Sequence, residues 1–461
     1  MSLHKKKVHF IGILGSGMSS LAAMALKLGY EVQGSDLGKT PHHSILDGCV
    51  IKDSQIKDGW RPAQIVVYSS AIPRKNPELA SARMAASEGI LVLHRSEFLQ
   101  HLMLAHTQII VSGTHGKSTT SALLTHIFDD LSLDPLSVIG AQMARYQASI
   151  RYGKGNYFIA EADESDGTLL NYQPFVGVVT NIDVDHLDFY GSFGNIVNMF
   201  DSFIDKISPD GFAALFWDNE PCRNLFRKKK REFVTFGFNL GSEIRALDIS
   251  QNGLTTHFKA VIDQEVYQIK IPLLGKHNIL NSLASLSVVH GLKLDLEKAI
   301  ASLSTFKGVQ RRLNLTFENE LIRIFDDYAH NPGKMSACIA SLKEAFPMEP
   351  LIIVFQAHRY SRLQTMYVPM LESLKSADYV IVAPVFAAGE PDISDFSPNK
   401  IAFDIEKLCY IRAIPVSDQD QIPEIIEDLK LGKITVLTCG AGDIYKVGQK
   451  IAAKYISSHS K

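Results

Sequence analysis

The sequence predicts an α/β protein of three consecutive domains built on mostly parallel sheets. Short apolar runs alternate with helical segments along the whole chain, which is typical of parallel strands covered by helices. Glycine-rich loops stand where predicted strands pass into helices. The chain has 461 residues, a length that suggests about three domains. We place these domains at residues 1–105, 106–312 and 313–461.

The composition argues against several classes of partner. Lysine plus arginine number 47 and aspartate plus glutamate 49, for a net charge of −2, so we expect no nucleic-acid partner and no membrane partner. The chain lacks the run of about 18 apolar residues that a membrane helix requires. Its five cysteines are scattered without a CxxC pair, which fits a reducing cytoplasm and indicates neither disulfides nor zinc. The sequence does not indicate an oligomeric state.

Two charged stretches have simple interpretations. Residues 5–25 imitate an export signal, but glycines interrupt the apolar part and a second predicted strand follows, so we expect a folded segment. The basic run Arg227–Arg231 is expected at a surface turn or helix end, with a phosphate-binding patch as the alternative.

The first domain opens as a βαβ unit. A strand at Val8–Ile11 and a helix at 18–28 flank a G-x-x-G-x-G loop, and a second strand at 30–34 ends in Ser35 and Asp36. Such a loop brings backbone N–H groups to a phosphate at a helix N-terminus, although many similar loops only pack a helix tightly on a sheet. Strands at 64–68 and 90–93 end in further candidates for phosphate or sugar contacts, which strand-end capping would also explain: Ser69, Ser70 and Arg95.

The second domain contains a stronger phosphate-binding signal. A predicted strand at 108–111 and a helix at 117–128 flank the loop Gly113-Thr114-His115-Gly116-Lys117-Ser118-Thr119. Glycines allow N–H groups to converge, the lysine adds a charge and the serine hydroxyl suits Mg²⁺. The strict Walker pattern requires glycine where Val111 stands, so this is a shortened variant. The alternative is a glycine turn with a surface lysine.

Two acidic strand ends follow the phosphate loop. A strand at 156–160 ends in Glu161–Asp166, and one at 176–180 ends in Asn181–Asp188 with His186 inside it. Clustered carboxylates repel one another without a cation, and Mg²⁺ beside a nucleotide would resolve this. A solvated acidic loop and a structural histidine are the alternatives. Later in the domain, Gly275–Asn281 resembles a helix start capped by Asn278. Its histidine could stack on the base of a nucleotide, and its asparagines could form hydrogen bonds to that base.

The third domain alternates again. Strands are expected at 322–325, 351–355, 379–383 and 434–438, and three polar segments follow them at 326–330, 356–362 and 387–390. Arg359 and Arg362 are three residues apart, so at a helix start they would share a face and clamp one carboxylate. Surface acids are the ordinary partners of such arginines.

Taken together, these motifs resemble the Mur ligase family, the ATP-dependent amide-forming ligases of bacterial cell-wall synthesis. The resemblance covers nearly the whole chain, and the acidic segment and the H-R-Y-x-R segment are most similar to the member that adds L-alanine. It implies a Rossmann-like N-terminal domain for the UDP-sugar, a central P-loop ATPase domain and a Rossmann-like C-terminal domain for the amino acid. The implied reaction joins L-alanine to UDP-N-acetylmuramate, with ATP and Mg²⁺, through an acyl phosphate.

The resemblance also implies residue roles. Lys117, Glu161 and His186 would be catalytic, with Ser118, Glu161 and His186 on metal. ATP would contact the phosphate loop, Gly113 to Thr119, together with His277, Asn278, Asn281, Arg312 and Asp326. The UDP-sugar would contact Gly12, Gly15, Gly17, Met18, Ser35, Asp36, Ser69, Ser70 and Arg95. L-alanine would contact Tyr328, His330, Arg359 and Arg362.

Some positions depart from the family pattern, and other functions compete. Ser118 replaces the usual threonine, Asn331 stands where a second histidine is common, and no lysine matches the carbamylated lysine of related ligases. The nearest alternative is the recycling ligase that attaches a tripeptide to the same UDP-sugar. A ligase that adds diaminopimelate is less compatible, because this sequence lacks the motif by which such ligases bind that amino acid. From another class, the first glycine loop and Asp36 would suit a non-catalytic nucleotide sensor.

Overall fold

The computed structural model describes residues 6–38, 46–53, 55–165 and 167–457. The chain forms two compact units, which are described separately. The first comprises Met1–Leu247, Lys259–Ile269 and Leu280–Lys307, and the second comprises Asp248–Phe258, Lys270–Ile279 and Gly308–Lys461. Asp166, the last acid of the predicted acidic segment, lies outside the described residues.

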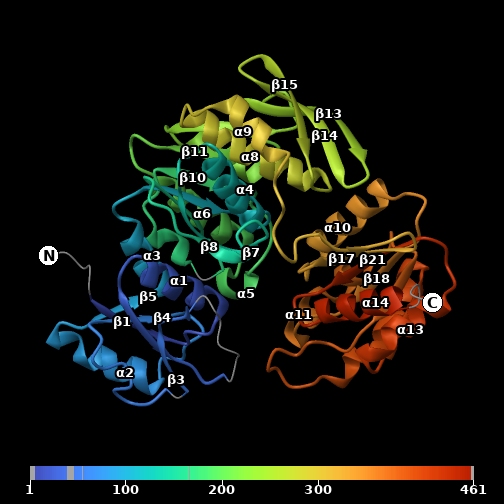
Figure 1. Ribbon diagram of the computed structural model, residues 1–461, viewed down its shortest axis with the longest axis horizontal. Helices are drawn as coiled ribbons and strands as arrows, with labels where there is room; N and C mark the ends of the chain where they lie inside the picture. Colours follow the sequence, from blue (N-terminus) through green and yellow to red (C-terminus); the bar gives the residue numbers. More distant parts are fainter. Residues whose placement is uncertain (1–5, 39–45, 54, 166, 458–461) are drawn as a thin grey trace. The chain divides into compact units, whose positions relative to one another are not determined.

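The first unit begins with a five-stranded parallel sheet (Figure 1). Its strand order is β3-β2-β1-β4-β5. Helices α1 and α3 cover one face through the cluster that contains Phe10, Met24 and Phe98. Helix α2 covers the other through Leu79 and Ala82. The elements are β1 Lys7–Ile11, α1 Ser16–Lys27, β2 Glu31–Ser35, β3 Val50–Lys52, β4 Ile65–Tyr68, α2 Pro77–Met84, β5 Leu91–His94 and α3 Arg95–Met103.

A ten-stranded sheet follows, in the order β15-β14-β13-β12-β11-β10-β6-β9-β7-β8. Its middle is parallel, because β6 pairs in parallel with both β9 and β10, whereas β7 and β8 pair antiparallel. The strands are β6 Thr107–Ser112, β7 Leu136–Met143, β8 Ala148–Arg151, β9 Tyr157–Glu161, β10 Val176–Val179, β11 Phe212–Phe216, β12 Glu232–Gly237, β13 Ile244–Asn252, β14 Thr255–Ile262 and β15 Glu265–Ile271. The helices are α4 Lys117–Asp130, α5 Leu187–Tyr190, α6 Phe193–Asp205, α7 Glu220–Lys228, α8 Lys276–Gly291 and α9 Leu296–Leu303.

The second unit contains a six-stranded sheet in the order β16-β17-β21-β18-β19-β20. Only the edge pair β16 and β17 is antiparallel among the pairings of this sheet in the described chain. One face packs against α10, α11 and α12, and the other against α13 and α14. The elements are β16 Asn314–Glu318, β17 Ile322–Asp327, α10 Pro332–Ala345, β18 Leu351–Phe355, α11 Tyr360–Glu372, β19 Tyr379–Val382, α12 Pro398–Cys409, β20 Arg412–Pro415, α13 Ile422–Asp428, β21 Ile434–Cys439 and α14 Tyr445–Ser457.

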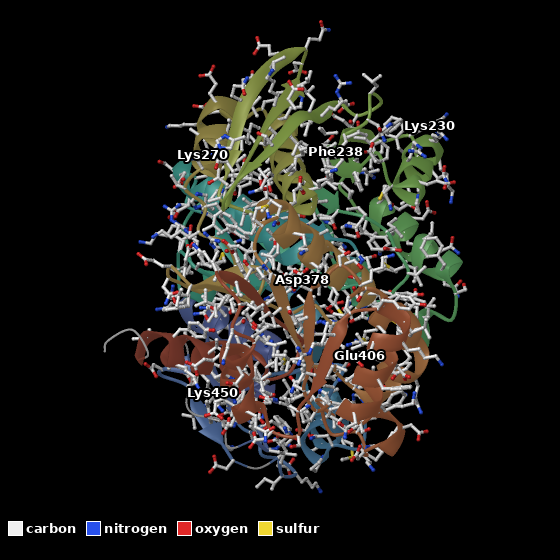
Figure 2. All side chains as sticks on the ribbon, turned by 90° about the vertical axis from the view of Figure 1, so that its right-hand side faces the viewer. Lys230, Phe238, Lys270, Asp378, Glu406 and Lys450 are labelled. Carbon is white, nitrogen blue, oxygen red and sulfur yellow. The ribbon has the colours of Figure 1, made fainter. Side chains whose placement is uncertain are left out.

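The α/β fold class with mostly parallel sheets is confirmed, and each strand named from the sequence is present within a few residues. The basic run lies at the end of α7, as expected, and Lys230 is exposed (Figure 2). The strands β13 to β15 were not predicted. Within the described residues, no helix has the length and apolar character to cross a bilayer.

Candidate active site

Three strand ends meet at one edge of the ten-stranded sheet. The parallel register sets Val111 of β6 beside Glu161 of β9, and Ser112 of β6 beside Val179 of β10. Because parallel strands point the same way, the phosphate loop after β6, the acidic segment after β9 and Asn181 after β10 emerge together. This edge is where ligands bind in open α/β sheets.

The phosphate loop is braced from the end of β10. The Asn181 carboxamide accepts the His115 N–H at 2.9 Å and donates to the His115 carbonyl at 3.0 Å. The Asn181 carbonyl accepts the Thr114 N–H at 3.0 Å. Gly113 has φ +127°, and a Cβ there would collide with Thr180 Oγ1, so only glycine fits. Sequence reasoning noted Asn181 at a strand end but missed that it holds the loop.

Lys117 is the first residue of α4 and has little exposure. Its Nζ donates to the Gly113 carbonyl and to Glu164 Oε2, each at 2.7 Å. Burial by itself lowers the pKa of Lys117, but Glu164, Asp163 and Glu161 outweigh it and raise that pKa. The side chains of Lys117 and Glu164 are 13% and 3% exposed. The sequence did not single out Glu164, because it cannot show which of the clustered acids turns toward the lysine.

The predicted metal ligands have different partners. Ser118 Oγ donates to Glu161 Oε1 at 3.0 Å, and the Gly140 N–H donates to the other oxygen of Glu161 at 2.8 Å. His186 instead lies beside Glu164, with Nε2 3.9 Å from Oε1. The structure thus brings Ser118 and Glu161 together and groups His186 with acids that the sequence analysis did not assign.

His186 and the acids beside it have the donor set of a divalent-cation site. Asp163, Glu164 and His186 each offer a ligand atom, and these atoms lie within 4.8 Å of one another. Glu164 Oε1 is buried and accepts no hydrogen bond from the described residues. Although burial opposes it, Lys117 and the Ser165 N–H lower the pKa of Asp163, which keeps it a carboxylate. Carboxylate oxygens suit Mg²⁺, and a histidine nitrogen is an unusual addition.

The predicted adenine contacts lie at the start of α8 and within it. Asn278 is buried inside the helix and donates to the Leu274 carbonyl at 2.8 Å. The expectation that Asn278 caps this helix is wrong, because α8 begins at Lys276. Asn281 accepts the Thr120 hydroxyl at 3.2 Å. Its side chain also packs against the phosphate loop, because a Cβ added at Gly116 would collide with it. His277 is half-buried.

The predicted UDP-sugar contacts surround the glycine loop before α1. Gly12 has φ +77° and donates to the Ser35 carbonyl at 2.8 Å, and Gly15 is the N-cap of α1. Around Gly17 the space for a Cβ is open. Asp36 Oδ2 accepts the Leu14 N–H at 2.9 Å.

The remaining members of this set differ in exposure. Ser70 is exposed and pairs with His94 Nε2 at 3.1 Å, while Ser69 and Arg95 are half-buried. Met18 and Ser35 are buried, and the Ser35 hydroxyl donates to Glu78. The contacts of these two residues with the UDP-sugar stay predictions, and the structure places both side chains inside the protein.

The second unit gathers its predicted residues after β17 and β18. Asp326 accepts the Thr438 hydroxyl at 2.7 Å and faces Arg311 Nε at 3.3 Å, and burial raises the pKa of Asp326 despite both partners. Arg311 lies between the rings of Tyr328 and Tyr445, 4.8 and 4.7 Å from their centroids. The neighbouring Arg312 stacks on the same Tyr328 at 5.6 Å.

Two histidines and two arginines converge near the start of α11. His330 Nδ1 donates to the Tyr328 carbonyl at 2.8 Å, which leaves Nε2 as an acceptor. Burial and then Arg362 lower the pKa of His330 to about 3, and burial followed by Arg362 and Arg359 lowers that of His358 to about 4. Both rings are therefore neutral at pH 7. The Arg359 side chain is exposed and its φ is +69°. The sequence analysis noted the segment that contains His358 but assigned this histidine no contact.

Three family models match the sequence in succession. The model described as Mur ligase family, catalytic domain, matches residues 7–107, the Mur ligase middle domain matches 111–289, and the Mur ligase, glutamate ligase domain, matches 311–442. The chain belongs to the Mur ligase family.

Named relatives of this Mur ligase match it over almost its whole length. It is 35% identical over 447 residues to the UDP-N-acetylmuramate–L-alanine ligase of Desulforapulum autotrophicum, covering 96% of this chain and 97% of that protein. The structure of MurC, the UDP-N-acetylmuramate-alanine ligase of Thermotoga maritima, matches with a TM-score of 0.82 and 27% identity, covering 98% of this chain and all of that one. A murein peptide ligase of Psychrobacter arcticus shares the fold, with a TM-score of 0.67, 21% identity and coverage of 97% and 98%.

Proposed function

We propose that this Mur ligase joins L-alanine to the lactyl carboxylate of UDP-N-acetylmuramate in the cytoplasm, with ATP as the energy source and Mg²⁺ as the cation. The observation that carries the chemistry is the buried Lys117 among carboxylates at the meeting point of three strand ends. The choice of substrates is supported by the full-length similarity to ligases of that name.

The three matched regions support the binding of a different substrate by each domain. In our proposal residues 1–105 bind the UDP-sugar, residues 106–312 bind ATP, and residues 313–461 bind the amino acid. Reaction then requires all three substrates to meet, which implies closure between domains.

In the first step, the lactyl carboxylate attacks the γ-phosphorus of ATP, the bond to the β-phosphate oxygen breaks, and an acyl phosphate and ADP form. Phosphoryl transfer depends on alignment and charge neutralisation. Lys117 would leave Glu164 for the phosphates. Asn181 accepts the N–H groups of Thr114 and His115, so other N–H groups of the loop would orient the phosphates. Bound by Asp163, Glu164 and His186, or by Ser118 and Glu161, Mg²⁺ would neutralise phosphate charge.

In the second step, the free amine of L-alanine attacks the acyl carbon to form the C–N bond, the bond from the acyl carbon to the phosphate oxygen breaks, and the proton lost by the amine goes to the departing phosphate. Arg359 and Arg362 would grip the alanine carboxylate, since guanidinium groups match carboxylates in geometry. His330 is neutral and presents Nε2 as an acceptor, so it can receive an N–H from the incoming amine without adding positive charge.

The direct test is phosphate release from ATP and Mg²⁺ by the purified protein with UDP-N-acetylmuramate and one of two amines. We expect release with L-alanine and none with the tripeptide L-alanyl-γ-D-glutamyl-diaminopimelate. The second candidate function is that of a murein peptide ligase, because this chain shares its fold with such an enzyme. Release only with the tripeptide would establish that candidate and refute our proposal.

A further inference from the structure

Glu78 is a fully buried acid that belongs to none of the predicted sites. It is the second residue of α2, and its side chain has no exposed surface. The Asn76 side chain caps this helix by accepting the N–H groups of Glu78 and Leu79 at 3.0 and 3.1 Å. The acid is therefore fixed at a helix N-terminus, where negative charge is favourable. Burying a carboxylate is costly unless it has partners, so its contacts need an explanation.

The carboxylate of Glu78 joins two adjacent strands of the first sheet. Its Oε2 accepts the hydroxyl of Ser35 at the end of β2. Its Oε1 faces Nε2 of His9, on β1, at 3.4 Å, and both side chains are fully buried. A Cβ on Gly59 would overlap Glu78 Oε1, so a glycine at this position leaves room for the carboxylate.

The surrounding hydrogen bonds define the His9 tautomer. Gln33 Nε2 donates to the Trp60 carbonyl at 2.6 Å and lies 3.2 Å from His9 Nδ1. An amide nitrogen is only a donor, so His9 Nδ1 accepts. A neutral His9 ring then carries its proton on Nε2, the nitrogen directed at Glu78. The acid thus accepts a hydrogen bond from Ser35 on β2, whereas His9 on β1 approaches it at 3.4 Å without forming one.

Ser35 connects Glu78 to the glycine loop. The Ser35 carbonyl accepts the Gly12 and Ile13 N–H groups at 2.8 and 3.1 Å. The next residue, Asp36, accepts the Leu14 N–H at 2.9 Å. The end of β2 therefore accepts three consecutive N–H groups of the loop. Glu78 in turn accepts the Ser35 hydroxyl at the end of β2.

We propose that Glu78 is a positioning residue for the UDP-sugar site: by fixing Ser35, it sets the conformation of the Gly12–Gly17 loop that receives the diphosphate. This inference rests on the proposed function, because it requires the loop to bind UDP-N-acetylmuramate. Glu78 touches no substrate itself. Its removal should therefore weaken the UDP-sugar specifically and leave the chemistry at Lys117 intact.

The test compares Glu78→Gln with a control on the same helix. Glutamine keeps the size of the side chain but replaces one carboxylate oxygen with an N–H₂ group, which cannot accept the Ser35 hydroxyl. We expect the KM for UDP-N-acetylmuramate and the Kd for UDP, measured by calorimetry, each to rise about tenfold, as for loss of a hydrogen bond to a charged group. The KM values for ATP and L-alanine and the kcat should stay within about twofold.

Ala82→Gly is the matched control, since Ala82 is equally buried on α2 but has an apolar side chain, which packs in the cluster with Trp60 and Leu79. Ala82→Gly should lower Tm with the KM for UDP-N-acetylmuramate unchanged. A UDP-sugar KM that is unchanged in Glu78→Gln, or one that rises together with the other two KM values, would overturn the positioning role.

Ser35→Ala tests the connection independently, should Glu78→Gln fail to fold. It should weaken UDP by a similar factor, and the double variant should be no weaker than the worse single variant, because both changes break one link. Full additivity, or no effect of Ser35→Ala on UDP, would overturn the inference. A wild-type protein that neither binds UDP nor ligates would refute the proposed function instead, so the two failures are distinguishable.

Discussion

The ion pair between Lys117 and Glu164 should show strong energetic coupling in the nucleotide-free protein. Nζ and Oε2 are 2.7 Å apart, and the side chains are 13% and 3% exposed. Breaking a buried pair from one side costs about 3–5 kcal/mol, because the remaining charge loses its partner. We expect Lys117→Met to cost about 4 kcal/mol, since it strands Glu164, and Glu164→Gln about 2 kcal/mol, since the lysine keeps the Gly113 carbonyl and two other acids.

The double variant removes both charges, so it should cost about 3 kcal/mol rather than the roughly 6 kcal/mol of independent changes. Urea unfolding followed by tryptophan fluorescence measures this cost. The sequence has two tryptophans, and both Trp60 and Trp217 lie in the first unit, so the signal reports on the unit that contains the pair.

A surface pair provides the control. Lys228 and Asp201 are 2.8 Å apart, but Lys228 is 62% exposed, so Lys228→Met should change stability by no more than about 0.5 kcal/mol. Coupling below about 0.5 kcal/mol between Lys117 and Glu164 would refute the reasoning, because two charges held this close out of water cannot act independently.

Three further predictions follow from other contacts. Asn181→Ala removes both hydrogen bonds to the His115 backbone, so kcat/KM for ATP in the phosphate-release assay should fall about 10- to 100-fold. Binding of UDP should be unchanged. Activity equal to that of the wild type would show that these hydrogen bonds are not required for the loop to function. Arg359→Ala should raise the KM for L-alanine but leave acyl-phosphate formation intact. An unchanged KM would refute the proposed contact between Arg359 and the alanine carboxylate. The lowered pKa of His330, about 3, means that below about pH 6.5 the unfolded chain binds a proton that the folded chain does not. The second unit should therefore lose about 1.4 kcal/mol per pH unit between pH 6 and 4 from this group, and His330→Gln should flatten the slope in hydrogen exchange.

The sequence was sufficient for the parallel strands and the loops that follow them. Strands buried on both faces appear as continuous apolar runs, and in β18 all five residues of Leu351–Phe355 are buried. Polar residues directly after such runs mark the edge where ligands bind, and Glu161 and the glycine-rich loop Gly113–Thr119 are predicted as site residues from this position. The strands β13 to β15 were missed, although burial alternates strictly along Thr255–Ile262. Period-two alternation was therefore the available signal.

Side-chain partners were less predictable, because they depend on contacts distant in sequence. The resemblance implies a UDP-sugar contact for Ser35, which stays a prediction, but it gives no sign that the Ser35 hydroxyl donates to Glu78, forty-three residues later. The expected contact of Asn281 with adenine stays a prediction, and the structure adds that Asn281 Oδ1 accepts the Thr120 hydroxyl. Neither pairing leaves a periodic pattern in the sequence, since each is set by the packing of a helix on a strand or on another helix.

The charges at the phosphate loop determine what this site can accept. Lys117 is a single ammonium group close to Glu164, Asp163 and Glu161, each of which raises its pKa. One positive charge among three negative ones repels a polyanion, and a triphosphate would in addition have to take Lys117 from Glu164. In the proposed function, the nucleotide would therefore have to bring its own positive charge. The acids that oppose free ATP would then become favourable partners, because Glu164 Oε1, buried without a hydrogen bond from the described residues, would gain a cation to face. On that proposal, we expect the site to favour the metal complex of the nucleotide over the free nucleotide.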